Sequence, residues 1–295
     1  MTSDPSILFD AETLERFEAA RLLARKQVRG SLRAERRSVQ RGASVEFAEY
    51  RPFVSGDDWR YIDWHAYARW RQLVLKLFVE EEDLHVHLLL DCSQSMNWGT
   101  PSKFDQARKV LAGLAYVTLA NLDRASIVPL GQMAIRPLPA ARGRERFTQL
   151  LRYLAACPLS ETPRSLEDSV RAWLATRPRR GTVIMIGDFF GTDRQDALRA
   201  LDRVRHARHE IGCIQITDPA ETTPPQPGEY EFEDIETGLV RRVIVDAKSS
   251  ATFLQSRQNF QATLLAHNRR YQIPLLETST QADLRAILTS VLDWR

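Results

Sequence analysis

The alternation of element types after residue 85 constrains the fold of this chain more than any other feature. Short β-rich apolar runs are separated by stretches of helical periodicity, which is typical of a mostly parallel sheet flanked by helices. We predict strands at 86–90, 125–130, 133–138, 182–187, 211–216 and 273–277. The first is nearly all apolar at its end, as expected of a central strand. Gly131-Gln132, between two β-like runs, predicts a hairpin, so the third strand should be an antiparallel edge strand.

Two stretches fall outside this alternation and define the expected organisation. The chain has 295 residues, more than the ~150 of an ordinary domain, so we predict a second folded part. Residues 1–85 are expected to form an N-terminal accessory module with a basic helical segment at 21–41, and residues 86–295 the α/β domain. The Pro-rich stretch 219–249 is predicted to be an insertion whose base emerges at the carboxyl edge of the sheet, where open α/β sheets bind ligands.

Several classes of function are disfavoured by absent motifs. The sequence has no apolar run of ~20 residues and no signal-like start, so we predict a cytoplasmic protein without a membrane span. Three widely spaced cysteines indicate neither a disulfide framework nor a zinc site. Neither a P-loop nor a G-x-S-x-G nucleophile elbow is present, which argues against nucleotide hydrolysis and serine-hydrolase chemistry.

Oxygen-bearing side chains follow two of the predicted strands. Asp91, Ser93 and Ser95 come directly after the first strand, and Asp188 directly after the strand at 182–187. Carboxylates and hydroxyls are hard donors that suit Mg²⁺ or Mn²⁺ better than zinc. If the two strands are neighbours, the two carboxylates meet at one edge of the sheet and repel unless a cation lies near them. The alternative is that each acid caps the turn or helix after its strand.

Residues 91–95, Asp-Cys-Ser-Gln-Ser, resemble the D-x-S-x-S pattern of the metal-ion-dependent adhesion site in the von Willebrand factor A family. The resemblance covers roughly residues 86–295 and implies a three-layer, Rossmann-like α/β fold with a bound Mg²⁺ or Mn²⁺. It also implies two further ligands, an aspartate after the fourth strand, matched by Asp188, and a loop threonine, matched by Thr162. Ser160 and Ser165, in the same loop, are the alternatives to Thr162.

A longer motif covers residues 46–64, EFAEYRPFVSGDDWRYIDW, followed by Ala68-Arg69. It is similar to a widespread bacterial family catalogued as a domain of unknown function and often encoded beside MoxR-type AAA+ ATPases. This resemblance extends over nearly the whole chain and implies such an ATPase as partner. From the residues alone, the turn at 55–58 is primarily structural, because Gly56 permits a positive φ and the aspartates can bond the turn backbone. The arginines and aromatic residues around it also suit a docking surface.

These observations lead to a hypothesis of a non-enzymatic adaptor. The metal site would bind an acidic side chain of a partner protein, and the ATPase would supply the work of remodelling or complex maturation. One rival is a metal-dependent, phosphatase-like hydrolase, which is weakened because Ser93 stands where a D-x-D motif would have its second acid. Another is a nucleic-acid binder acting through residues 21–41, for which a solvated or partner-facing helix is the simpler interpretation.

Overall fold

The structure is a computed structural model, and it divides the chain into two compact units. It describes residues 8–28, 38–40, 46–80, 84–131, 136–161, 164–190, 193, 195–235 and 238–294. One unit contains the chain up to Ala24 and from Leu84 onward, and the other contains residues 25–83. The described residues 8–24 therefore do not belong to the accessory module, where we had placed them. Phe17, only 1% exposed, explains this, because its ring packs against those of Tyr116 and Phe147.

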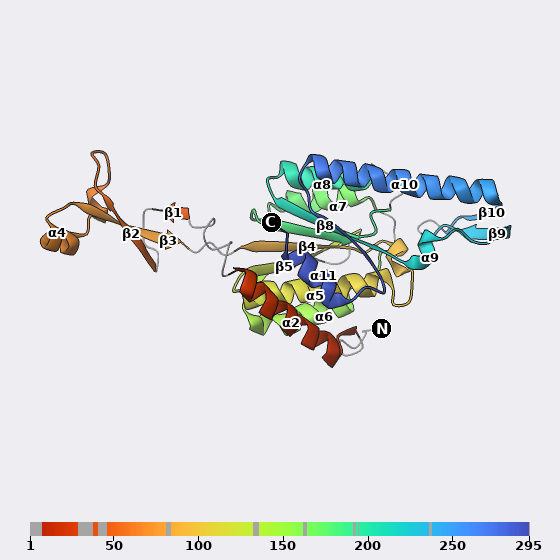
Figure 1. The fold of residues 1–295 in the computed structure, drawn as a ribbon, viewed down its shortest axis with the longest axis horizontal. Helices are drawn as coiled ribbons and strands as arrows, with labels where there is room; N and C mark the ends of the chain where they lie inside the picture. The colour runs from red at the N-terminus through yellow and green to blue at the C-terminus, as the bar shows by residue number, and fades with distance from the viewer. Residues whose placement is uncertain are drawn as a thin grey trace. The chain divides into compact units, whose positions relative to one another are not determined.

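The larger unit is built on a six-stranded sheet (Figure 1). Its strands are β4 (His85–Asp91), β5 (Arg124–Leu130), β6 (Leu138–Arg142), β7 (Thr182–Gly187), β8 (Glu210–Thr217) and β11 (Leu275–Ser279). Their order is β11-β8-β7-β4-β5-β6, and every neighbouring pair is parallel except β5 and β6. The predicted fold is confirmed, with β4 central and one antiparallel edge strand. That strand begins at Leu138, the last residue of the predicted range 133–138, and Arg142 pairs with Arg124; residues 133–135 lie outside the described residues.

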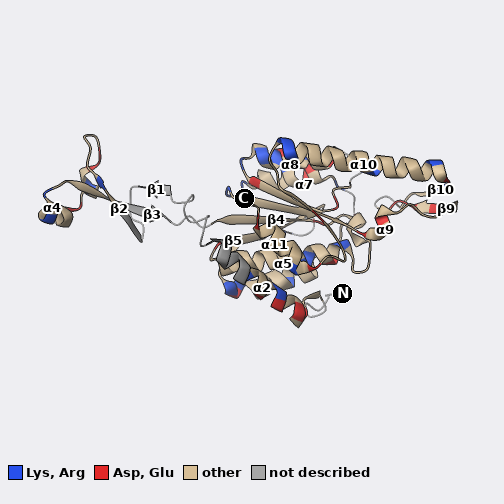
Figure 2. Cartoon of the chain, viewed as in Figure 1, with Lys and Arg blue, Asp and Glu red and all other residues tan. Residues whose placement is uncertain are grey.

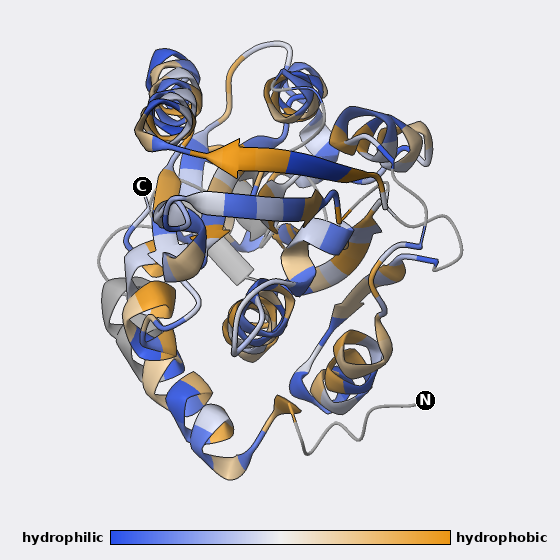
Figure 3. Ribbon diagram, turned by 90° about the vertical axis from the view of Figure 1, so that its right-hand side faces the viewer, coloured by the Kyte–Doolittle hydropathy of each residue, from blue (hydrophilic) through white to orange (hydrophobic). Residues whose placement is uncertain are grey.

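Helices cover both faces of the sheet, so the unit has three layers (Figures 1 and 3). On one face lie α2 (Ala11–Val28), α5 (Lys103–Ala120), α6 (Phe147–Ala156) and α11 (Leu284–Leu292). On the other lie α7 (Leu166–Ala175), α8 (Asp196–His206) and α10 (Ala247–Arg270). Each face has its own apolar core, which is why the central strand is apolar throughout its second half. α5 begins after Ser102, whose hydroxyl accepts the Asp105 N–H at 3.0 Å.

The stretch after β8 forms a projecting arm, which we define as residues 219–245. It contains α9 (Pro219–Thr222) and an antiparallel pair, β9 (Gly228–Glu233) and β10 (Val240–Val245). α10 begins directly after it and runs beside it (Figure 1). The arm therefore leaves the sheet at the carboxyl end of β8, as the sequence position indicated.

The smaller unit has a three-stranded antiparallel sheet with the order β1-β3-β2. Its elements are β1 (Ser38–Gln40), β2 (Glu46–Pro52), the 3-10 helix η1 (Trp59–Tyr61), α4 (Trp64–Trp70) and β3 (Val74–Glu80). Its aspartates cap turns: Asp57 accepts the Val54 N–H and pairs with Arg51 at 2.5 Å, and Asp63 caps α4 and accepts the Tyr50 hydroxyl at 2.9 Å. Gly56 has φ 106. The long motif thus has the structural role expected of it.

Two buried histidines near the amino-terminal ends of the strands make stability sensitive to pH. The His87 ring contacts the Ser126 hydroxyl and the Arg179 carbonyl, each at 2.8 Å, and its centroid lies 5.5 Å from that of His209. Burial lowers the pKa of His87 and, together with the charge of a protonated His87, that of His209. Both rings are therefore harder to protonate in the folded protein than in the unfolded chain.

We expect the free energy of unfolding to fall as pH decreases below about 6.5, the unperturbed histidine value. The unfolded chain takes up protons first, so the loss continues until the folded pKa values are reached. Urea denaturation between pH 8 and pH 5 measures it. The double variant His87→Gln/His209→Gln should lose much of this dependence, whereas His206→Gln, at an exposed position on α8, should keep it. If the free energy of unfolding changed equally with pH in wild type and in both variants, His87 and His209 would not be the source of the pH dependence.

Candidate metal site

The carboxyl ends of β4 and β7 bring the two predicted aspartates to one edge of the sheet. Leu90 pairs with Ile186, so Asp91 lies opposite Gly187 and one residue from Asp188. A Cβ on Gly187 would lie 2.7 Å from Asp91 Oδ2, so only glycine leaves room for this carboxylate. Asp91 is 3% exposed and Asp188 is fully buried. The neighbouring strands that the sequence argument required are therefore present.

The turn after β4 gathers the motif oxygens. Asp91 Oδ1 accepts the Ser93 N–H at 3.0 Å, and the hydroxyls of Ser93 and Ser95 lie 2.9 Å apart. Ser95 is in the short 3-10 helix η2 (Gln94–Asn97), which turns it back toward Ser93. Asp188 Oδ1 likewise accepts the Phe190 N–H at 3.0 Å. Each aspartate thus caps its own turn, as the alternative interpretation held, while the oxygens also gather at one edge.

A third loop closes over this turn through Ser160. The Ser160 N–H donates to the Cys92 carbonyl at 2.6 Å, and its hydroxyl donates to the Gly131 carbonyl at 2.7 Å. Gln94 Nε2 donates to the Ser160 carbonyl at 2.6 Å. Ser165 instead caps α7 by accepting the Asp168 N–H. Thr162, the loop ligand predicted from the resemblance, lies outside the described residues, and Ser160 is the described loop residue whose backbone contacts the motif at Cys92 and Gln94.

A buried lysine, which the sequence argument missed, contacts the site. Lys103 Nζ lies 2.8 Å from Asp188 Oδ2 and 2.6 Å from Glu221 Oε1, and the side chain is 1% exposed. Burial alone would lower the pKa of Lys103, but the charge of Asp188 and the hydrogen bonds that the ammonium donates to both acids raise it, so the ammonium stays charged. A signal was available, because a lysine in the first turn of a helix opposes the helix dipole and needs anionic partners.

Glu221 connects the arm to the site. It is in α9, where Asp218 forms a capping box with it, and the other Asp218 carboxylate oxygen accepts the Thr280 hydroxyl at 2.7 Å. Arg257 of α10 donates to the Glu221 carbonyl at 2.9 Å. The first turn of the arm is therefore held against the start of α5 and belongs to the site itself. The sequence could not place Glu221, since proline-rich turns reveal nothing about the direction of the chain.

The residues at this edge fit a divalent cation. Asp91 and Asp188 supply carboxylate oxygens at adjacent strand ends, and Lys103 pairs with Asp188 and Glu221 beside them. The remaining donors are hydroxyl oxygens, the hard ligands these ions prefer. Among the described residues no three His, Cys, Asp or Glu side chains converge as a metal cluster, so the predicted site depends on hydroxyls, those of Ser93, Ser95 and Thr162, for three of its five ligands.

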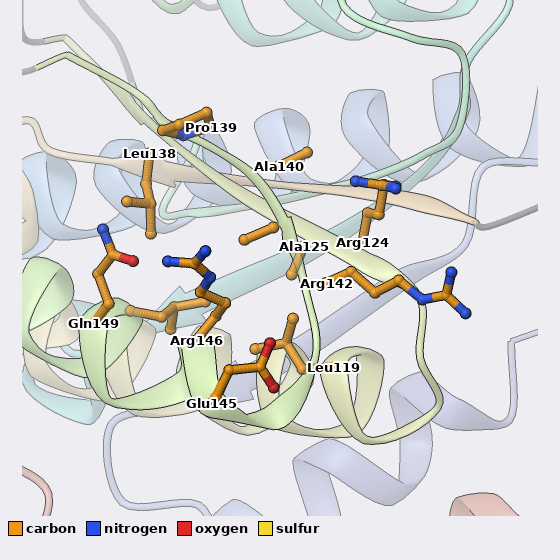
Figure 4. A pocket seen from close by; sticks show the side chains of 12 residues that line it. Leu119, Arg124, Ala125, Leu138, Pro139, Ala140, Arg142, Glu145, Arg146 and Gln149 are labelled. Carbon is orange, nitrogen blue, oxygen red and sulfur yellow. The ribbon is translucent and has the colours of Figure 1, made fainter.

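Two cavities lie in the described part of the larger unit. A cavity of about 440 Å³ lies between β5, β6 and α6, near the start of β5, and Figure 4 shows Arg124, Arg142, Arg146 and Glu145 on its wall. It is at the opposite end of β5 from the site. A second cavity, of about 480 Å³, is lined by residues of the stretches 97–108 and 157–159, which adjoin the site loops in the sequence. The second cavity alone lies beside the candidate site.

The strand order and the single antiparallel edge strand define a von Willebrand factor A-like protein, with the residues of the adhesion-site motif at the expected strand ends. A family model described as "Protein of unknown function DUF58" matches residues 49–270. The chain belongs to this family. No helix in the described part of the chain has the length and apolar character needed to cross a membrane.

Relatives extend over most of the chain. An uncharacterized protein of Mycobacterium tuberculosis is 27% identical over 285 residues, covering 95% of this chain and 87% of its own. Another, from Mycobacterium avium, is 32% identical over 155 residues, covering 50% of this chain and 86% of its own. Among solved structures, BatB from Bacteroides thetaiotaomicron aligns with a TM-score of 0.43 and 14% identity, covering 70% and 97%. The SpRpn10 VWA domain aligns with a TM-score of 0.43 and 14% identity, covering 71% of this chain and 95% of its own. The fold assignment rests on the strand order rather than on these scores.

Proposed function

We propose that this protein is a non-enzymatic, metal-dependent adaptor that binds an acidic side chain of a partner protein at the carboxyl edge of its sheet. The observation that carries the proposal is the gathering of Asp91, Ser93, Ser95 and Asp188 at neighbouring strand ends. These four residues would hold Mg²⁺ or Mn²⁺, with a loop hydroxyl from Thr162 or Ser160. When bound, the ion supplies a Lewis-acidic position that a partner carboxylate can complete.

An apolar surface beside this edge supports protein binding. The arm exposes six large apolar side chains, Phe232, Ile235, Leu239, Val240, Val243 and Ile244. Leu239 is 60% exposed and Ile244 68%, and Phe253 and Leu254 at the start of α10 are also exposed. Large apolar side chains exposed on a projecting hairpin favour contact with another protein over solvation. Because Glu221 anchors the arm to Lys103, a partner could contact the arm and the metal site together.

The partner we propose is a MoxR-type AAA+ ATPase, on the basis of the family resemblance, with both proteins acting in the cytoplasm on a client. The arginines of α8 do not favour nucleic acid instead. The arginines on α8, conspicuous in Figure 2, pair with acids: Arg199 and Arg203 with Glu167 at 2.5 Å, and Arg205 with Asp202 at 3.2 Å. Most side chains of the basic 21–41 segment lie outside those described.

The test is association with a MoxR-type AAA+ ATPase, measured by calorimetry in Mg²⁺ and in EDTA. We expect binding in Mg²⁺ and a large loss in EDTA. The variant Leu239→Ser/Ile244→Ser should weaken association about 10-fold or more, since each exposed anchor contributes on the order of 1 kcal/mol, and should leave Mg²⁺ affinity intact. The matched control is Leu122→Ser, an exposed leucine, 56% accessible, after α5. Equal ATPase binding in Mg²⁺ and EDTA would refute metal dependence.

A further inference from the structure

Two cysteines lie beneath the candidate site with their sulfur atoms 3.9 Å apart. Cys92 stands between two predicted metal ligands, Asp91 and Ser93, and Cys157 ends α6 as its C-cap. Both are free and buried, and both belong to the core on the α5 side of the sheet. The third cysteine, Cys213, lies in the core on the opposite face, and burial raises its pKa to about 12.

We propose that Cys92 and Cys157 form a reversible disulfide when the protein encounters hydrogen peroxide, and that this bond displaces the loop carrying Ser93 and Ser95. The first half of the proposal stands on the sulfur geometry alone. Its consequence for metal binding rests on the proposed function. Disulfides in cytosolic proteins are typically transient and redox-sensing. Two cysteines that are free thiols until an oxidant joins them are consistent with this.

Cys157 is the sulfur that peroxide can reach. It lines the cavity of about 480 Å³ together with Pro158, Leu159 and Arg108. The hydrogen bond from the Cys92 thiol lowers the pKa of Cys157, and the charge of Arg108 adds to this against the opposing effect of burial. A cysteine with a lowered pKa that lies near an arginine and lines a cavity is in the kind of environment in which cysteines react with peroxide. Cys92, which is fully buried behind it, is placed to act second.

The chemistry balances in two steps. The Cys157 thiolate attacks one peroxide oxygen, the O–O bond breaks, and the departing hydroxide takes a proton to become water, leaving a sulfenic acid. The Cys92 sulfur then attacks the Cys157 sulfur, the S–O bond breaks, and the hydroxide leaves as water with the proton of the Cys92 thiol. Two thiols and one peroxide yield one disulfide and two waters. A cellular dithiol reverses the bond by thiol–disulfide exchange.

The disulfide would disturb the candidate metal site through hydrogen bonds that are already present. The sulfur atoms must approach from 3.9 Å to about 2.05 Å. Close packing around the fully buried Cys92 limits rotation of its side chain, so we infer that the backbone of one or both segments moves. Those segments are joined by the Ser160 N–H to the Cys92 carbonyl and by Gln94 to the Ser160 carbonyl. Any shift of Cys92 therefore passes to Ser93 and Ser95, whereas metal ligands tolerate only about 0.2 Å of displacement.

The first experiment counts thiols in the full-length protein before and after stoichiometric peroxide, with peptide mapping without reductant. We expect wild type to lose two of its three thiols, to yield a peptide linking Cys92 to Cys157, and to recover both with dithiothreitol. Cys213→Ser should behave like wild type in this respect, and Cys157→Ser should give no linked peptide. Retention of all three thiols in wild type, or a linkage that includes Cys213, would overturn the proposal.

The second experiment reads the loop directly by amide hydrogen exchange and by Mg²⁺ titration. Oxidised wild type should change its exchange in residues 92–98 and 157–161 and bind Mg²⁺ about 10-fold or more weakly, while oxidised Cys157→Ser should change neither. A linked peptide with unaltered exchange would overturn the coupling to the loop. If reduced wild type binds no Mg²⁺ although linkage and exchange behave as expected, the proposed metal function fails and the disulfide stands.

Discussion

Replacement of Lys103 by methionine is expected to lower the free energy of unfolding by about 3–5 kcal/mol, the usual cost of removing one partner from a buried ion pair. Methionine fills nearly the same volume, so the cost arises from charge. Asp188 would remain fully buried without the ammonium 2.8 Å away, and Glu221 would lose its contact with α5. Urea denaturation at pH 7 in EDTA measures the effect without a contribution from bound metal.

The matched control for Lys103 is an ion pair of the same kind on the surface. Arg242, with its side chain 88% exposed, pairs with Glu231 at 2.6 Å across the arm. Arg242→Met should change stability by no more than about 0.5 kcal/mol, because exposed pairs are screened by solvent. The double variant Lys103→Met/Asp188→Asn should recover part of the loss by removing the unpaired charge. A change below about 1 kcal/mol for Lys103→Met would show that Asp188 is not held by this contact.

The second large effect is expected for metal binding in Asp91→Asn. Asparagine keeps the size of the side chain and an oxygen that can accept the Ser93 N–H, so the turn should persist. The ion loses a charged ligand, and we expect Mg²⁺ affinity to fall at least about 100-fold, since even residues that only support a ligand contribute 10–100-fold. Calorimetric titration of Mg²⁺ and Mn²⁺ into wild type and variant measures this, with thermal denaturation to verify folding.

The control for Asp91 is an aspartate remote from the site. Asp168, on α7, has its side chain 44% exposed and pairs with Arg171, so Asp168→Asn should bind Mg²⁺ as wild type does. Equal affinity in wild type and Asp91→Asn would remove Asp91 from the ligand set. Absence of binding in wild type, with and without the ATPase, would leave the fold assignment but remove the metal-dependent function.

Strand and helix positions could largely be predicted because local periodicity reports burial. The strand at 182–187 was predicted at its observed bounds. Most of the edge strand was missed, since β6, with the sequence LPAAR, has neither alternation nor an apolar run. Its position follows from pairing with Arg124 across the sheet, a contact that no local pattern records.

The sequence alone determined which residues end the strands, and therefore that Asp91, Ser93, Ser95 and Asp188 gather at one edge. This follows because parallel strands place their carboxyl ends together. Only the tertiary structure decided that Lys103 and Glu221 join them, that Phe17 attaches the first helix to the sheet unit, and that Cys157 approaches Cys92. Each of these contacts joins segments distant in sequence, whose meeting depends on packing geometry rather than on local periodicity.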